Sequence, residues 1–146
     1  MTAQTELQIS GLEAVLTRAR QDSVEFPFML ANHVPMVLVA LDRLGASPER
    51  LMQWYETYRT GHSLPLQPAP VAPITAANWT SALGDRTRER DYRDFFKAEV
   101  RRLGMAGAIR SYIPPMSGGV GGSATHPLMR LAYALLNCDP EEVGNA

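Results

Sequence analysis

Apolar residues recur at helical spacing along most of this chain, and this periodicity restricts its fold more than any other feature. The segment 11–20 places one apolar stripe along a helix: Leu12, Val15, Leu16 and Ala19. The segment 87–103 does the same with larger side chains: Tyr92, Phe95, Phe96, Val100 and Leu103. No stretch of the sequence shows the sustained alternation of apolar and polar residues that half-buried strands require. We therefore expect an all-α fold without a sheet.

The segment 32–44 carries the signals of a helix that is buried on nearly every side. Asn32 is a residue type that caps helix starts, and Pro35 suits a first turn. Gly45 suits the left-handed conformation that follows a helix end. Because the interior MVLVAL offers no polar face, we expect this helix to be surrounded by other elements.

Proline and glycine divide the rest of the chain. Closely spaced prolines over 61–73 favour extended backbone, which predicts a linker or a wrapping loop. Short helices are predicted over 79–83 and 106–112, the second stopped by Pro114 and the proline after it. A further helix, opened by Thr125, His126 and Pro127, has the apolar character of a buried element.

Length and charge point to a single helical domain over residues 1–146. A chain of 146 residues suits one core. Fourteen basic and fifteen acidic side chains give a net charge of -1, so neither nucleic acid nor an anionic membrane is expected as a partner. The charged run DRTRERDYRDFF (85–96) is interpreted as the solvated face of a helix.

Targeting signals are lacking in the sequence. Its start has no basic segment followed by a continuous apolar stretch, and the apolar run 34–41 is too short to cross a bilayer. We expect a soluble cytoplasmic protein. The single Cys138 cannot form an internal disulfide and is interpreted as a packing residue.

The sequence contains two similar helix-turn-helix units. LGASPERL (44–51) aligns with LNCDPEEV (136–143) at an offset of 92 residues. In each unit a leucine ends one helix and Gly45 or Asn137 suits the left-handed conformation. A capping residue, a proline and a glutamate then begin the next helix. A histidine near a proline opens the preceding helix of both units, in NHVPM and THPLM. We interpret the two as a structural repeat.

The second unit is shorter than the first. The helix that begins at Pro48 is predicted to continue to Tyr58, whereas only EEVGNA follows Pro140. Short isolated helices are marginal in water, so the second unit lacks a complete second helix. We therefore interpret the chain as the amino-terminal portion of a larger helical domain. A homodimer that pairs two copies through the unfinished helices is the alternative.

His33 and His126 are the candidate chemical residues, because each opens a helix beside a proline. The positive end of a helix favours the neutral ring, which is the form that binds metals. Two histidines alone are an incomplete metal site, and the residues by themselves favour a capping or core role. His62, in the loop RTGHSLPL, is left unassigned.

The sequence resembles the questin oxidase-like family over nearly its whole length. The resemblance lies in ANHVPMVLVALDRLGASPERL, in APITAANWTSALGDRTRERDYRDFFKAEVRRLG and in THPLMRLAYALL. Its most specific pieces are the Asn-His opening before an aliphatic helix, the LGAS-type turn, the Asn-Trp segment, the aromatic helix and the histidine that opens the last helix.

This resemblance implies an all-helical oxidoreductase. Named fungal members open anthraquinone rings by Baeyer-Villiger-type oxygen insertion associated with NADPH and O2, and some relatives are non-haem iron enzymes with histidine ligands and a modified lysine. Carried over, the resemblance makes His33 and His126 candidate Fe(II) ligands and a small aromatic or quinone-like compound the expected substrate. The sequence has no dinucleotide-binding fingerprint, so NADPH would serve a separate reductase.

Met36 departs from the family pattern, because fungal members often carry a second histidine there and a thioether does not replace imidazole on ferrous iron. Five residues could line an apolar substrate pocket: Met36, Trp54, Phe95, Phe96 and Tyr133. Each of them also suits an ordinary core. The leading hypothesis is therefore an oxygenase that oxidises or ring-opens a polycyclic aromatic substrate. The rival is a non-catalytic helical domain that binds a ligand or another protein.

Overall fold

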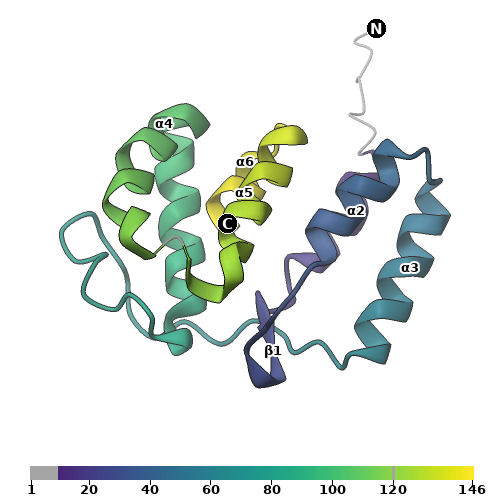
Figure 1. Cartoon of the computed structure of the whole chain (residues 1–146), viewed down its shortest axis with the longest axis horizontal. Coiled ribbons are helices and arrows are strands. Elements are labelled where there is room, and N and C mark those ends of the chain that lie inside the picture. The colour runs from purple at the N-terminus through teal and green to yellow at the C-terminus, as the bar shows by residue number, and fades with distance from the viewer. Residues whose placement is uncertain (1–9, 120) are drawn as a thin grey trace, which may run out of the picture.

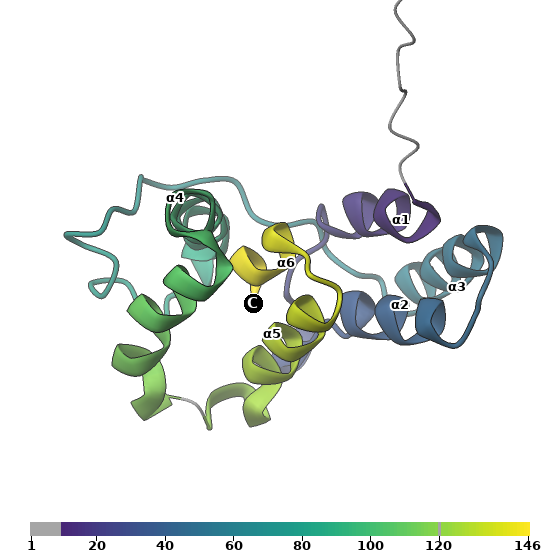
Figure 2. The same ribbon diagram turned by 90° about the horizontal axis from the view of Figure 1, so that it is seen from above.

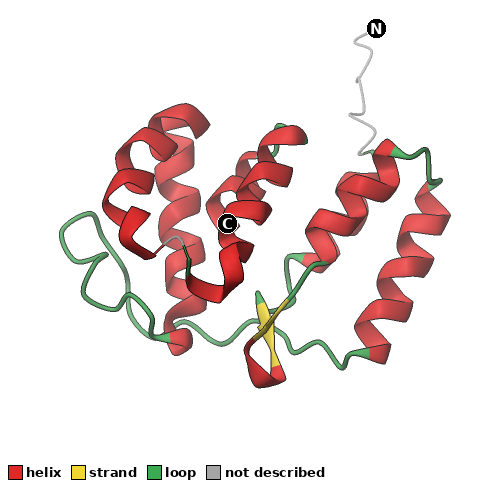
Figure 3. Ribbon diagram, in the orientation of Figure 1, coloured by secondary structure: helices red, strands yellow, loops and turns green. Residues whose placement is uncertain are grey.

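The computed structural model of the chain describes residues 10–119 and 121–146. Over these residues it contains six α-helices: α1 (Gly11–Ala19), α2 (Val34–Arg43), α3 (Pro48–Gly61), α4 (Glu89–Met116), α5 (His126–Leu136) and α6 (Pro140–Asn145). Short 3-10 turns lie at Pro27–Met29, Arg86–Arg88, Ser117–Gly119 and Gly122–Thr125. Helices dominate the molecule, as Figure 3 shows, and the prediction of an all-α fold is confirmed.

The expectation that there is no sheet is wrong in one detail. β1 (Glu25–Phe26) pairs antiparallel with β2 (Leu30–Ala31) across the turn Pro27–Met29. Phe28 has a positive φ of 69° in this turn. Strands of two residues are too short to produce an alternating pattern, so no pattern of residues indicated them.

The helices pack in two groups, each with its own core. α1, α2 and α3 lie together at the right of Figure 1, and α4, α5 and α6 lie together at its centre and left, an arrangement that Figure 2 repeats from above. The first core contains Leu12, Val15, Leu16, Val34, Leu38, Val39, Leu51 and Tyr55. The second is smaller and contains Val100, Ala108, Ala134 and Val143. α2 packs against α5 and so joins the two groups.

The two aliphatic helices differ in how much of their surface is covered. α2 is buried along most of its length, as its sequence predicts. The same prediction is wrong for α5, since Leu128 is 48% and Leu136 is 52% exposed. α5 contacts α2 and α6, and the side chains of these leucines stay exposed despite these contacts.

α4 is interrupted at Gly104, which has φ 70° and ψ 162°. The helix changes direction there, so its two halves stand side by side in Figure 1. Its second half runs on to Met116 through Pro114, and the prediction that the helix stops before this proline is wrong. The prolines fall in the last turn of the helix, where fewer intrahelical hydrogen bonds are lost than in its interior. Among the described residues no helix is both long and apolar enough to cross a membrane.

Gly104→Ala is expected to lower the free energy of unfolding by about 1–3 kcal/mol, because only glycine adopts this backbone conformation without strain. Space is not the obstacle, since an added Cβ would meet no atom within 4 Å. Gly61→Ala is the control, because Gly61 has equally open surroundings without a positive φ. Urea denaturation should separate the two variants, and equal midpoints would contradict the strain argument.

Beyond Gly61, which ends α3, the proline-rich segment up to residue 73 is a wrapping loop. Ser23 donates a main-chain hydrogen bond to the carbonyl of Pro65 at 2.8 Å, and Gln67 donates one to the carbonyl of Gln21 at 2.9 Å. Further along, residues 76–84 form turns, so the short helix predicted over 79–83 is wrong. Trp79 is nevertheless held by ring contacts with the aromatic residues of α4.

The repeat proposed from sequence corresponds to two helix-turn-helix units, α2–α3 and α5–α6. Ser47 accepts a hydrogen bond from the amide of Arg50, and Asp139 accepts one from the amide of Glu142, as the two caps predict. The left-handed residue is Gly45 in the first turn. In the second turn it is Cys138, one residue later than the predicted Asn137.

Candidate functional site

His33 and His126 lie against each other in the fold. Their Nε2 atoms are 2.9 Å apart, and the rings meet edge to face with centroids 4.7 Å apart. Both side chains are half-buried. Residues separated by 93 positions in the sequence, at the starts of α2 and α5, thus form a single pair of facing imidazoles.

Asn32 positions the first histidine. Its Oδ1 accepts a hydrogen bond from the amide of Val34 at 2.9 Å, and its Nδ2 donates one to the carbonyl of Ser23 at 2.8 Å. Asn32 is 3% exposed, so both bonds are shielded from water. The N-cap position of α2 is occupied by His33, one residue later than the predicted Asn32, and it is the side chain of Asn32 that accepts from the first helical amide.

The packing of α2 on α5 positions the second histidine. His126 is the first residue of α5, after a left-handed Thr125 with φ 66° and before Pro127. At the other end of the two helices, Arg43 donates a hydrogen bond to the carbonyl of Leu136 at 2.7 Å. Contacts at both pairs of ends mean that α2 and α5 run in the same direction, which brings their amino termini together at the histidines.

The geometry of this pair suits two kinds of interaction. A separation of 2.9 Å allows one neutral ring to donate a hydrogen bond to the other. It also suits two ligands of one metal ion, because bonds of about 2.1 Å at about 90° place two nitrogens about 3 Å apart. Within the described residues, no group of three or more histidine, cysteine, aspartate or glutamate side chains could hold a metal ion. The described part of the chain therefore offers two imidazole ligands, which fits part of a metal site.

A pocket opens beside His126, with about 430 Å³ of empty space including its mouth. Its apolar lining includes Met36 and Pro127, and its polar lining includes Asn32 and Arg130. Met36 is thus the predicted pocket residue that the structure brings to the histidine pair.

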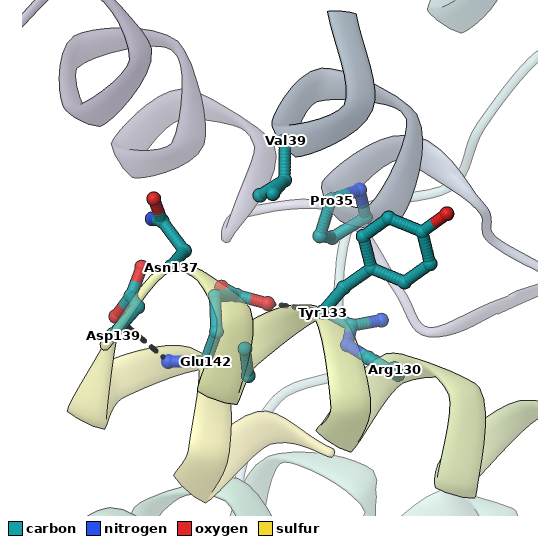
Figure 4. A pocket seen from close by; sticks show the side chains of 8 residues that line it. Pro35, Val39, Arg130, Tyr133, Asn137, Asp139 and Glu142 are labelled. Carbon is teal, nitrogen blue, oxygen red and sulfur yellow. Dashed lines mark hydrogen bonds and ion pairs between the residues drawn. The ribbon is translucent and has the colours of Figure 1, made fainter. Parts of the chain in front are cut away.

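Trp54 and Tyr133 lie elsewhere. Trp54 stacks on Tyr58 of α3 with ring centroids 5.0 Å apart. Tyr133 lines a second, smaller pocket with Pro35 and Val39 between α2 and α5, shown in Figure 4. Both aromatic side chains pack against the first core.

Phe95 and Phe96 belong to an aromatic cluster around α4. Their rings lie 5.7 Å and 5.3 Å from the ring of Tyr112, and Phe96 also contacts Trp79 and Tyr92. Neither phenylalanine lines the pocket beside His126 or the one in Figure 4. The structure thus separates these two residues from the histidine pair.

Glu142 of α6 is the centre of a buried ionic network behind the pocket. Arg20 donates from Nε to its Oε1 at 3.0 Å, and Arg130 donates from Nη2 to its Oε2 at 3.2 Å. Asn145 donates to Oε1 at 3.0 Å. Although burial acts to raise the pKa of Glu142, Arg130 and Arg20 outweigh it and hold that pKa below its ordinary value. These bonds hold α6 in place despite its length of six residues.

Arg93 extends the network to α4. It donates to the carbonyl of Arg20 at 2.8 Å, to the carbonyl of Asp22 at 3.0 Å and to Oδ1 of Asn145 at 3.0 Å. Arg93 is 3% and Asp91 is 5% exposed. The interpretation of 85–96 as a solvated face is therefore wrong for these two residues, whose charges are paired inside the protein.

Sequence reasoning missed Arg130, which lines both pockets and is 7% exposed. One signal could have drawn attention to it. Arg130 follows His126 by four positions, and residues at that spacing share a helix face. Spacing alone does not distinguish a buried arginine from a solvated one, because the partner Glu142 lies on a different helix.

One family model matches the part of the chain that contains most residues of the histidine pair, the pocket and the network. A family model described as Questin oxidase-like matches residues 30–143 of the 146. No curated protein and no solved structure is significantly similar to the chain. The matched segment includes both histidines, Arg130 and Glu142 and covers most of the chain. The chain therefore belongs to the questin oxidase-like family, an oxidoreductase-type family.

Proposed function

We propose that this chain supplies part of the active site of an O2-dependent oxidoreductase that oxidises or ring-opens a polycyclic aromatic or quinone substrate. The observation that carries the proposal is the 2.9 Å approach of His33 Nε2 to His126 Nε2. Family membership supports the reaction class, and the apolar wall of the pocket beside His126 suits an aromatic compound.

In this proposal, His33 and His126 are the residues that would hold an iron ion. When bound, iron supplies the binding and activation of O2. Asn32 fixes the start of α2 and with it the direction of His33. Met36 and Pro127 supply apolar lining to the pocket beside His126. NADPH, if it is the electron source, acts through a separate reductase.

Oxygen uptake tests this function. The iron-loaded chain, given a reduced hydroxylated anthraquinone, should consume O2, and His33→Ala should lower the rate at least about a hundredfold because an iron ligand is lost. His62→Ala is the matched control. The His62 ring is exposed and stacks on Tyr58 at 4.1 Å, so its loss should leave the rate within about twofold. Equal rates for His33→Ala and the wild type would contradict the proposal.

A further inference from the structure

We infer that Glu25 of β1 is a specificity-determining residue that accepts a hydrogen bond from a neutral hydroxyl group of an aromatic ligand in the pocket beside His126. The identity of the ligand as an aromatic compound rests on the proposed function. The pocket and the unused acceptor of Glu25 do not depend on a metal.

Glu25 lines the pocket from a fixed position on the hairpin formed by β1 and β2. It pairs with Ala31 across the two strands, and both residues line the pocket. Its amide donates a hydrogen bond to Oγ of Ser23 at 3.2 Å, and the amide of Val24 donates one to Oε1 of Glu89 at 3.0 Å. The backbone that carries the Glu25 carboxylate is therefore in place before a ligand binds.

One oxygen of the Glu25 carboxylate is able to accept a further hydrogen bond. Its Oε2 accepts from Nε of Arg86 at 2.6 Å, whereas its Oε1 receives no hydrogen bond from the described residues. The side chain of Glu25 is 23% exposed, so a ligand in the pocket can reach the carboxylate. A carboxylate has about four lone-pair sites, and the single bond from Arg86 leaves most of them unused.

Other polar side chains of the pocket are already engaged by the protein. Asn32 uses both ends of its amide on the chain around the start of α2. Asn145 and Arg130 both donate hydrogen bonds to Glu142. Compared with these side chains, Glu25 is the lining residue that offers a ligand an acceptor not used by the described part of the chain.

A carboxylate oxygen restricts the ligand groups that it binds. It accepts from an O–H donor, and such charge-assisted bonds are stronger than bonds between neutral groups. It repels a phenolate, and a ring without a donor leaves it unpaired. Met36 and Pro127 supply apolar lining to the same pocket, so an aromatic ring that carries a neutral hydroxyl suits both features. A hydroxyl bound at Glu25 then restricts how the attached ring lies relative to His126.

Equilibrium dialysis with the metal-free chain tests this inference. The probes are β-naphthol, its methyl ether and naphthalene, which share one ring system and of which only the first is a donor. The wild type should bind β-naphthol at least about tenfold more tightly than the methyl ether. Glu25→Met should reduce this preference to within about twofold, because the acceptor is lost, and should leave the affinity for naphthalene within about twofold.

Two further variants separate recognition from effects on the hairpin. Arg86→Met is the matched control, because it breaks the same ion pair and keeps the carboxylate, so its preference for β-naphthol should equal or exceed that of the wild type. Glu25→Gln keeps the size of the side chain and a neutral acceptor, so its preference should be intermediate, and it decides the question if Glu25→Met does not fold. An equal loss of the preference in Arg86→Met and the Glu25 variants would mean that the ion pair merely holds the hairpin, and would overturn the inference.

The remaining outcomes are also decisive. The absence of a preference for β-naphthol in the wild type would overturn the inference. Tighter, Glu25-dependent binding of β-naphthylmethylammonium would mean that the pocket takes cations, and would overturn the assignment of a hydroxyl. An unchanged preference in both Glu25 variants together with intact iron binding would overturn this inference alone. Glu25-dependent recognition without any iron binding would instead overturn the proposed function and leave this inference standing.

Discussion

Glu142→Gln is expected to lower the free energy of unfolding by about 3–5 kcal/mol, the largest stability effect of any single substitution considered for this chain. Glu142 is 3% exposed and receives hydrogen bonds from Arg20 and Arg130. A neutral glutamine leaves the buried Arg130 without its counter-charge, whereas Arg20 keeps its ion pairs with Asp139 and Glu13. Guanidinium chloride denaturation followed by circular dichroism measures the loss.

Glu141→Gln is the matched control for that experiment. Glu141 precedes Glu142 on α6, but its side chain is 34% exposed and pairs with Arg101 at the surface. Exposed ion pairs contribute about 0–1 kcal/mol, so this variant should unfold close to the wild type. If Glu141→Gln and Glu142→Gln lose the same stability, the buried network does not hold α6 in place.

The acid stability of the protein should depend on the same residue. The folded-state pKa of Glu142 lies below its ordinary value of 4.5, so its contribution is present above that value and is lost as the pH falls through the folded pKa. The difference in unfolding free energy between the wild type and Glu142→Gln should therefore shrink on acidification below about pH 4.5.

The second large effect concerns iron. His33→Ala and His126→Ala should each weaken Fe(II) binding at least about a hundredfold, because each removes one of two imidazoles whose Nε2 atoms are 2.9 Å apart. The two losses should be similar, since neither ring can hold the ion without the other. Anaerobic titration with a competing chelator measures both affinities. A strong loss in one variant alone would mean that the two rings do not share an ion.

The sequence was sufficient to predict the helices that carry the site. Prolines, caps and aliphatic runs located the starts of α2 and α5 within a residue or two, and the internal repeat singled out His33 and His126 as equivalent positions. Their approach to 2.9 Å is a tertiary property, because it depends on α2 packing alongside α5. The repeat suggested similarity of the two units but not their contact.

The predictions of burial from sequence failed mainly at charged residues. A run such as 85–96 has the composition of a solvated face, yet Arg93 and Asp91 are buried with their charges paired. Arg93 pairs with Glu89 one turn earlier on α4, but its other hydrogen-bond partners lie on the segment after α1 and on α6, at sequence separations of 52 to 73 residues. Local patterns carry no information about such partners, so neither the network nor the role of Arg130 could be predicted from them.

The prediction for α5 failed for a related reason. An aliphatic run predicts burial on all sides only when enough elements pack around it. In this chain α5 contacts α2 and α6, and Leu128, Leu135 and Leu136 stay exposed. The residues of α2 are of the same type, but α1, α3 and α5 all contact that helix.

Iron content per chain tests the central claim most directly. Wild-type protein, the double variant His33→Ala, His126→Ala and the control His62→Ala would be loaded with Fe(II) without oxygen, desalted and analysed by inductively coupled plasma mass spectrometry. We predict equal iron contents per chain in the wild type and in His62→Ala, and less than about one tenth of that content in the double variant. An iron content that is unchanged in the folded double variant would contradict the assignment of the two histidines as ligands.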